Sequence, residues 1–245
     1  CEKALRLSSK NPDALLALGR TQLAAGKQKE ALDSFRRVRE MFPDVGEGHY
    51  AYGMILMSKE RFEDARGALL RAVELGTSPA LAHLGLARIA RKQGRDDRAM
   101  HHYSRSIECD PRNSTVASNN LAAMMLKAER NSSLALGLAV HAHLDAMTPQ
   151  TADTLTQAYI RTGNAAQALD VARIAAETRP EDPARQLRLG IAAAATGNLQ
   201  ESREALSAVL NLSPDSELGR RAQSMLDAFA EGYGSVEENA GTMPN

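Results

Sequence analysis

The feature that most constrains the fold of this 245-residue chain is a regular spacing of small residues and prolines. Small residues recur at intervals of 33 to 36 positions: Ala31, Ala65, Ala99, Ala135, Ala168 and Ser202. Prolines follow a similar period: Pro12, Pro43, Pro79, Pro111, Pro149, Pro180 and Pro214. A period of about 35 residues indicates helical repeats that bury their apolar faces only by stacking on one another.

Two further series share this period. Four positions after each small residue stands a residue that we expect to fill the gap between helix pairs: Phe35, Leu69, Tyr103, Ala139, Ala172 and Leu206. About twelve positions before each small residue stands another residue that is mostly small and allows close helix approach: Gly19, Gly53, Ala87, Ala122, Thr156 and Gly190. Proline cannot continue a helix, so the prolines mark the turns between repeats. Glycines fall in or near the turns inside them: Gly26, Gly94, Gly163 and Gly197.

This pattern resembles the tetratricopeptide repeat over roughly residues 12–216. The resemblance implies an all-α fold, a right-handed superhelical solenoid of about six helix–turn–helix repeats with a C-terminal capping helix. We place the units at 12–45, 46–79, 80–113, 114–148, 149–182 and 183–216. The remaining segments are expected to be the second half of a partial repeat (1–11), the capping helix (217–230) and a flexible tail (231–245). An extra residue or two in 128–133 predicts a bulge.

Composition and charge disfavour several classes of fold and function. Trp is absent, and Phe and Tyr number 4 and 5, which disfavours a β-sandwich or barrel. The chain has 30 Lys and Arg against 30 Asp and Glu, so no net charge draws it to nucleic acid. Residues 1–113 carry 20 basic and 15 acidic side chains, and the rest carries 10 and 15. No apolar run is long enough to span a bilayer, and two cysteines exclude a disulfide framework.

No set of residues typical of catalysis is present. The pairs His101–His102 and His141–His143 lack the spacing of four that places two imidazoles on one helix face. Phosphate-binding glycine loops and nucleophile elbows are also missing. We therefore predict that the chain is not an enzyme and holds neither a metal nor a cofactor.

The resemblance implies that the first helix of each unit lines a concave groove. Carried over position by position, it gives these candidate partner-binding residues: Arg20, Tyr50, Met54, Met57, Arg88, Arg91, Lys92, Asn119, Asn120, Asp153 and Gln157. The same positions of the later units include Lys127, Arg161, Leu187 and Ile191. The order from apolar to basic to amide side chains suits an acidic, amphipathic segment, bound as an extended strand or a helix.

Each part of this groove has a simpler interpretation. Arg88, Arg91 and Lys92 lie at helical spacing and form either a carboxylate-binding step or a solvated face. The dipeptide Asn119-Asn120 resembles a motif of peptide-binding repeats, in which an Asn amide holds the ligand backbone. Alternatively, an Asn at this position only bridges adjacent repeats. The carboxylate clamp of chaperone-binding repeats is not expected, because most of its positions mismatch.

Three hypotheses about function remain open. Residues 116–210 resemble repeat blocks of bacterial envelope proteins, including lipoproteins of type IV and Tad pilus systems and subunits of exopolysaccharide export. This implies a pilotin-like scaffold at the periplasmic face of the outer membrane, whose partner is a peptide or a secretin or export-pore subunit. Cys1 is then its lipidated residue; alternatively the chain is cut inside an earlier repeat. The other hypotheses are a cytoplasmic adaptor and a segment of a larger protein, such as the regulatory arm of an enzyme.

Overall fold

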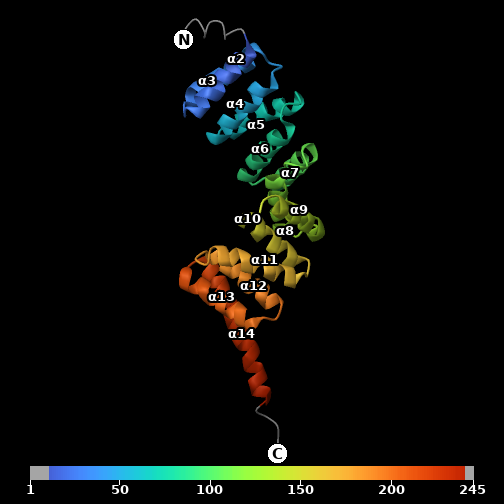
Figure 1. Cartoon of the computed structure of the whole chain (residues 1–245), viewed down its shortest axis with the longest axis vertical. Coiled ribbons are helices and arrows are strands. Elements are labelled where there is room, and N and C mark those ends of the chain that lie inside the picture. Colours follow the sequence, from blue (N-terminus) through green and yellow to red (C-terminus); the bar gives the residue numbers. More distant parts are fainter. Residues whose placement is uncertain (1–10, 241–245) are drawn as a thin grey trace, which may run out of the picture. The chain divides into compact units, whose positions relative to one another are not determined.

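A computed structural model describes residues 11–240 of the chain, with side chains through residue 230. Every regular element in that range is an α-helix (Figure 1). The helices are α2 (Pro12–Ala24), α3 (Gln28–Met41), α4 (Gly46–Ser58), α5 (Phe62–Glu74), α6 (Pro79–Lys92), α7 (Asp96–Cys109), α8 (Thr115–Lys127), α9 (Ser132–Asp145), α10 (Pro149–Arg161), α11 (Ala165–Thr178), α12 (Pro183–Ala195), α13 (Leu199–Leu212) and α14 (Glu217–Ala240). The predicted all-α fold class is confirmed. The predicted half-repeat at 1–11 lies almost wholly outside the described residues, and so does Cys1.

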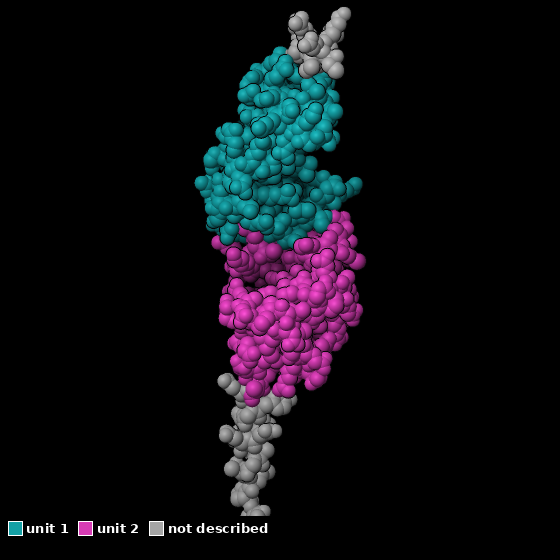
Figure 2. All heavy atoms as spheres, turned by 90° about the vertical axis from the view of Figure 1, so that its left-hand side faces the viewer, with its two compact units in different colours: residues 1–121 teal, residues 122–245 magenta. Residues whose placement is uncertain are grey.

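The chain divides into two compact units, unit 1 with residues 1–121 and unit 2 with residues 122–245, coloured separately in Figure 2. In unit 1, helices α2 to α7 each pack on the next helix along the chain. In unit 2, the same consecutive packing runs from α9 to α14. First helices of successive pairs also touch, α4 with α6 in unit 1 and α10 with α12 in unit 2. Each unit therefore has the stacked helix pairs that the repeats predict.

The starts of the first helices follow from local sequence. Proline occupies the first turn of four of them: Pro12, Pro79, Pro149 and Pro183. It is well tolerated there, because the first turn leaves backbone N–H groups unpaired in any case. At α10 the cap is reciprocal: Thr148 Oγ1 accepts from the Thr151 backbone N–H, and the Thr148 N–H donates to Thr151 Oγ1. Of the predicted series, Pro12, Pro79 and Pro149 begin a first helix, and the other four lie between helices, so these prolines mark the turns between repeats, as predicted.

The turns inside the repeats differ in length at one place, between α8 and α9. Gly26, Gly94, Gly163 and Gly197 have φ of 74°, 69°, 77° and 78°, in the left-handed region that glycine adopts without strain. The turn between α8 and α9 has four residues, 128–131, whereas the turn between α2 and α3 has three, 25–27. Glu129 and Asn131 adopt positive φ there, 53° and 42°. This is the extra residue that the sequence indicates in 128–133.

The small residues of the repeat sit at the tightest helix contacts. All six members of the first series are fully buried: Ala31, Ala65, Ala99, Ala135, Ala168 and Ser202. A methyl group added at Gly19 would lie 2.7 Å from the Phe35 ring, and one added at Gly190 would lie 2.8 Å from Leu206. The predicted packing of the large residues against the small ones is therefore confirmed at these pairs.

The closing helix is longer than predicted. The sequence predicts a capping helix over 217–230, and α14 instead runs from Glu217 to Ala240. The predicted flexible tail at 231–245 is thus corrected over its first ten residues, while 241–245 lie outside the described residues. An established helix gains one backbone hydrogen bond for each added residue, which offsets the cost of about 1 kcal/mol for a helical glycine. The start of α14 packs on an apolar cluster that contains Leu187, Leu206 and Val209.

Candidate functional site

The first helices of unit 1 are joined by side chains that the sequence assigns to the groove. We call this surface the first-helix strip; it comprises the predicted residues of unit 1 together with Glu47 of α4: Arg20, Glu47, Tyr50, Met54, Met57, Arg88, Arg91, Lys92, Asn119 and Asn120. Arg20 of α2 forms an ion pair with Glu47 of α4. Arg91 of α6 donates from Nη1 to Oδ1 of Asn120 in α8, at 3.0 Å. The strip therefore carries polar links between successive first helices.

The apolar part of the strip lies on α4. Tyr50, Met54 and Met57 are half-buried and pack against a core cluster formed by α4, α5 and α6. A cleft of about 450 Å³ opens beside them, and Tyr50, Met54 and Arg20 line it. Burial raises the pKa of Tyr50, and the nearby Arg88 guanidinium opposes that shift. The arrangement brings an aromatic ring, flexible thioethers and a cation together on one surface.

The basic part of the strip lies on α6. Arg88, Arg91 and Lys92 are all exposed. Among the described residues, Arg88 and Lys92 have no ion-pair partner, whereas Arg91 is bonded to Asn120. Burial raises the pKa of Tyr103, and Arg91 and Arg88 oppose that shift. Arg88 and Lys92 are thus the cations best placed to meet a carboxylate from outside.

The two asparagines of α8 differ. Asn120 accepts from Arg91 and donates from Nδ2 to the Val116 carbonyl oxygen at 2.7 Å, so its amide already serves contacts within unit 1. Asn119 is half-buried, and its Oδ1 has no hydrogen-bond partner among the described residues. Asn120 therefore bridges adjacent repeats in this structure, and of the two amide oxygens that of Asn119 is the unsatisfied one. The role of both in ligand binding stays a prediction.

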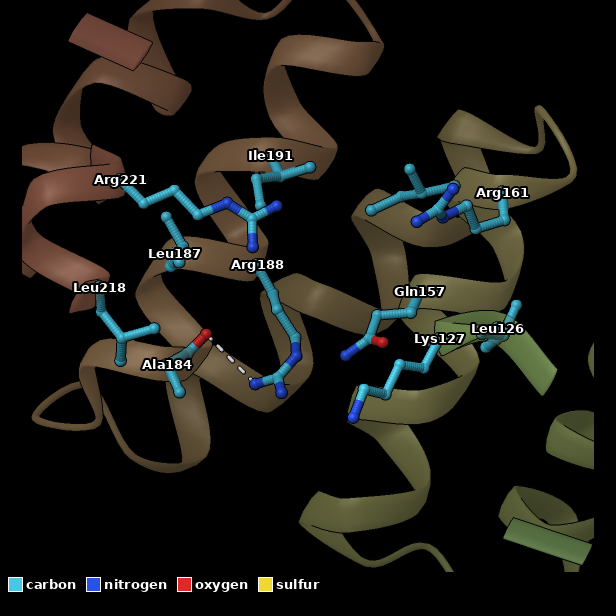
Figure 3. A pocket seen from close by; sticks show the side chains of 11 residues that line it. Leu126, Lys127, Gln157, Arg161, Ala184, Leu187, Arg188, Ile191, Leu218 and Arg221 are labelled. Atoms are coloured by element: carbon cyan, nitrogen blue, oxygen red, sulfur yellow. Dashed lines mark hydrogen bonds between the residues drawn. The ribbon is translucent and has the colours of Figure 1, made fainter. Parts of the chain in front are cut away.

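Unit 2 places its groove candidates around a second cleft, of about 310 Å³ (Figure 3). Gln157 lines it, together with other first-helix residues of the predicted groove: Lys127, Arg161, Leu187 and Ile191. Asp153 does not line this cleft. Its carboxylate pairs with Arg188 at 3.1 Å; burial raises its pKa, and Arg188 and Arg185 oppose that shift. The pairing indicates that Asp153 holds α10 to α12.

Sequence reasoning missed three features of these units. Arg188 and Arg221 line the cleft of unit 2, although neither occupies a groove position of the repeat pattern. In unit 1, His83 Nδ1 lies 3.2 Å from His102 Nδ1, with the rings stacked at 5.3 Å. The spacing of nineteen residues gives no local signal for this contact, which depends on how α6 packs against α7.

The part of the chain that the structure describes has no cluster of three or more His, Cys, Asp or Glu side chains able to hold a metal ion. Among those residues, no helix is both long and apolar enough to cross a bilayer. The expectation that the chain is not an enzyme and binds no metal stays a prediction.

Comparison with known proteins identifies the repeat. The sequence matches the tetratricopeptide repeat over residues 2–46, 16–79, 50–114 and 154–217. No curated protein sequence matches the chain significantly. Among solved structures, pilF of Pseudomonas aeruginosa is 15% identical, with a TM-score of 0.69 over 87% of this chain and 97% of that one. PilW, a type IV pilus biogenesis factor, is 15% identical, with a TM-score of 0.62 over 86% and 98%.

A third similar structure comes from a larger assembly. The APC/C hetero-tetramer Cut9–Hcn1 is 18% identical, with a TM-score of 0.59 over 90% of this chain. The chain spans 46% of that protein's length, so the likeness covers less than half of it. At these identities the solved structures show a shared fold. The repeat match covers most of the sequence, and the chain therefore belongs to the tetratricopeptide repeat family, whose fold is a scaffold for protein–protein interaction.

Proposed function

We propose that this chain is an adaptor that binds an acidic, amphipathic segment of a partner protein along the first-helix strip of unit 1. The observation that carries this proposal is the meeting of two chemistries on adjoining first helices. Tyr50 and Met54 on α4 offer apolar surface, and α4 contacts α6, which carries Arg88 and Lys92 without ion-pair partners among the described residues.

Electrostatics favours an acidic partner at this strip. Burial raises the pKa of the Tyr50 hydroxyl, and Arg88 is near enough to oppose that rise, so a ligand side chain seated on the ring also meets the guanidinium. A carboxylate accepts two parallel hydrogen bonds from one arginine, which adds specificity to the attraction. Exposed charges are screened over about 8 Å at physiological ionic strength, and we therefore expect affinity to fall as salt rises.

In the cell, we place this adaptor in the bacterial envelope, at the periplasmic face of the outer membrane, as an assembly factor for a pilus, secretion or export system. The support is the shared fold with pilF and with the pilus biogenesis factor PilW, each matched over nearly its whole length. Fractionation of cells that express the native gene tests this placement. Recovery of the protein in the outer-membrane fraction supports it, and recovery in the cytoplasm rejects it in favour of a cytoplasmic adaptor.

The binding surface is tested by charge reversal with a matched control. A partner is first captured on the immobilised chain, identified, purified and titrated by surface plasmon resonance. We expect Arg88→Glu with Lys92→Glu to weaken binding of the partner about tenfold or more and to make the affinity less sensitive to salt. Arg95→Glu with Arg98→Glu changes the net charge equally at exposed sites of unit 1 outside the strip. That control is expected to leave the affinity within about twofold.

Tyr50→Ala tests the apolar half of the same surface. An aromatic anchor acts mainly on the dissociation rate, so we expect faster dissociation with little change in association. Circular dichroism confirms that each variant keeps its helix content. Equal losses from the strip and control reversals would mean that net charge alone drives binding. Unchanged affinity in both strip variants would mean that the partner binds elsewhere, on the second helices of the repeats.

A further inference from the structure

We propose that unit 2 carries a second recognition site, separate from the first-helix strip of unit 1, which takes an acidic residue and a neighbouring apolar side chain of a partner protein. The site is the cleft between the end of α8 and helices α10, α12 and α14. All of its lining residues belong to unit 2. We call it the basic cleft.

The charge of the basic cleft has one sign. Four cationic side chains line it, and no acidic side chain does: Lys127, Arg161, Arg188 and Arg221. Figure 3 shows Arg161 of α10 and Arg221 of α14 on opposite sides of the cleft, with Lys127, Gln157 and Arg188 between and below them. A concave surface of one charge concentrates its field and selects a ligand of the opposite charge.

The four cations are not equally available. Arg188 pairs with Asp153 at 3.1 Å and donates to the Ala184 carbonyl oxygen at 3.2 Å. Arg161 pairs with Glu129 at 2.8 Å. Lys127 and Arg221 are exposed, and among the described residues neither has an ion-pair partner. Two positive charges are thus left to meet a carboxylate that enters the cleft.

The lining between the cations is apolar. Leu187 is nearly fully buried, and Ile191 and Leu218 are half-buried. The cleft volume of about 310 Å³ is at the lower end of the range for small-molecule sites, about 300–1,000 Å³. It therefore suits a side chain or two of a protein segment rather than a large cofactor. An apolar side chain can rest on these residues while its acidic neighbour faces Lys127 and Arg221.

The closing helix makes this site different from the other helix surfaces. Leu218 and Arg221 stand three positions apart on α14, which places both on the face toward the cleft. The adjacent Arg220 is also exposed, but it donates to the Asp215 carbonyl oxygen and does not line the cleft. The chain thus supplies a control cation one residue from the proposed ligand-binding one.

The test uses the full chain in a background that disables the strip of unit 1, Arg88→Glu with Lys92→Glu. The probe is a fluorescein-labelled peptide of alternating Glu and Leu, titrated by fluorescence anisotropy at low ionic strength. We expect this background to bind the peptide. Adding Arg221→Glu or Lys127→Glu is expected to weaken binding about tenfold, whereas Arg220→Glu leaves it within about twofold. A peptide with Ser in place of Leu is expected to bind about tenfold more weakly.

The failures are distinguishable. If the background variant does not bind the peptide, or if Arg220→Glu weakens binding as much as Arg221→Glu, the basic cleft is not a recognition site. If the Ser peptide binds as well as the Leu peptide, the cleft is a general anion site and the proposal is wrong. Neither result bears on the strip of unit 1, which is tested with its own partner and variants.

Discussion

The helix interfaces of unit 1 and unit 2 are filled in different ways. In unit 1, large side chains lie against glycine or alanine, as with Phe35 over Gly19 and Leu69 beside Gly53. In the fifth repeat, in unit 2, the filling residue is Ala172, and Thr156 occupies the position that glycine has in the first, second and sixth repeats. The sixth repeat returns to the first arrangement, with Leu206 over Gly190.

This difference shows that the repeat does not require one residue type at its helix interfaces. A core packed to the density of a crystal has no room for a large side chain on both helices. Where a glycine stands on one helix, a large side chain fills the space beside it, as in the first, second and sixth repeats. Unit 1 therefore concentrates its packing in a few large side chains, while this part of unit 2 spreads it over many alanines: Ala168, Ala172, Ala192 and Ala193.

Removing a large filling residue is expected to give the largest effect. Phe35 is fully buried, so Phe35→Ala removes most of an aromatic ring and leaves a cavity. We expect a loss of about 3–5 kcal/mol in the free energy of unfolding. The matched change in unit 2, Ala172→Gly, removes one methyl group from a helix and should cost about 1 kcal/mol. Urea unfolding of the full chain measures both, and equal costs would refute the contrast.

Enlarging a small buried residue is expected to have the next largest effect on the free energy of unfolding. Ala99 is fully buried at a helix contact, so Ala99→Leu overpacks it and should cost about 1–3 kcal/mol. The same change at Ala168 is predicted to cost less, because three of the residues buried in its cluster are alanines, Ala172, Ala192 and Ala193, which leave fewer bulky atoms to displace. The urea midpoints of the two variants give the comparison. An unchanged midpoint for Ala99→Leu would contradict the packing described for the third repeat.

Adding a single methyl group to a glycine of unit 1 is expected to have opposite effects at a packed and at an exposed position. A Cβ at Gly53 would lie 2.9 Å from Leu69 Cγ, so Gly53→Ala is expected to destabilise by about 1–2 kcal/mol. A Cβ at Gly67, on the exposed side of α5, meets nothing within 4 Å. Gly67→Ala should therefore stabilise by about 0.5–1 kcal/mol through helix propensity. Thermal melting that moves in the same direction for both would be inconsistent with this account.

Acid is expected to act mainly on unit 1. Burial, and then the neighbouring His83, His101 and Arg98, lower the pKa of His102 from 6.5 to about 4. The unfolded chain therefore binds the proton first. The stability that the chain gains by keeping His102 neutral is fully present above pH 6.5 and is lost as pH falls toward 4. Nuclear magnetic resonance titration should give His102 an acidic pKa, and a value near 6.5 would contradict the packed pair.

A variant distinguishes the effect of the His83–His102 contact on acid stability from the effect of acid on the rest of the chain. His102→Asn should flatten the fall of the urea midpoint between pH 7 and pH 5, because it removes a group that is kept neutral by the fold. His101→Asn, at the exposed neighbour, serves as its control.

The fold was predictable because its spacing is set by packing. Buried positions such as Ala31 and Phe35 must recur once per repeat, and the sequence displays that period directly. The candidate sites were predictable only as positions on first helices. Which side chains meet depends on rotamers and on contacts between distant residues, as with Arg91 and Asn120 or His83 and His102. Arg221 was missed because the closing helix lies outside the repeat pattern.

The central claim is that unit 1 binds its partner on the first helices. Site-specific photo-crosslinking in the native cell tests it most directly, with a benzophenone amino acid at Tyr50 on α4 or at Asp33 on the exposed side of α3. We predict a covalent adduct with one defined partner from position 50, lost when Arg88→Glu and Lys92→Glu are added, and no adduct from position 33. An adduct from position 33 alone would contradict the claim.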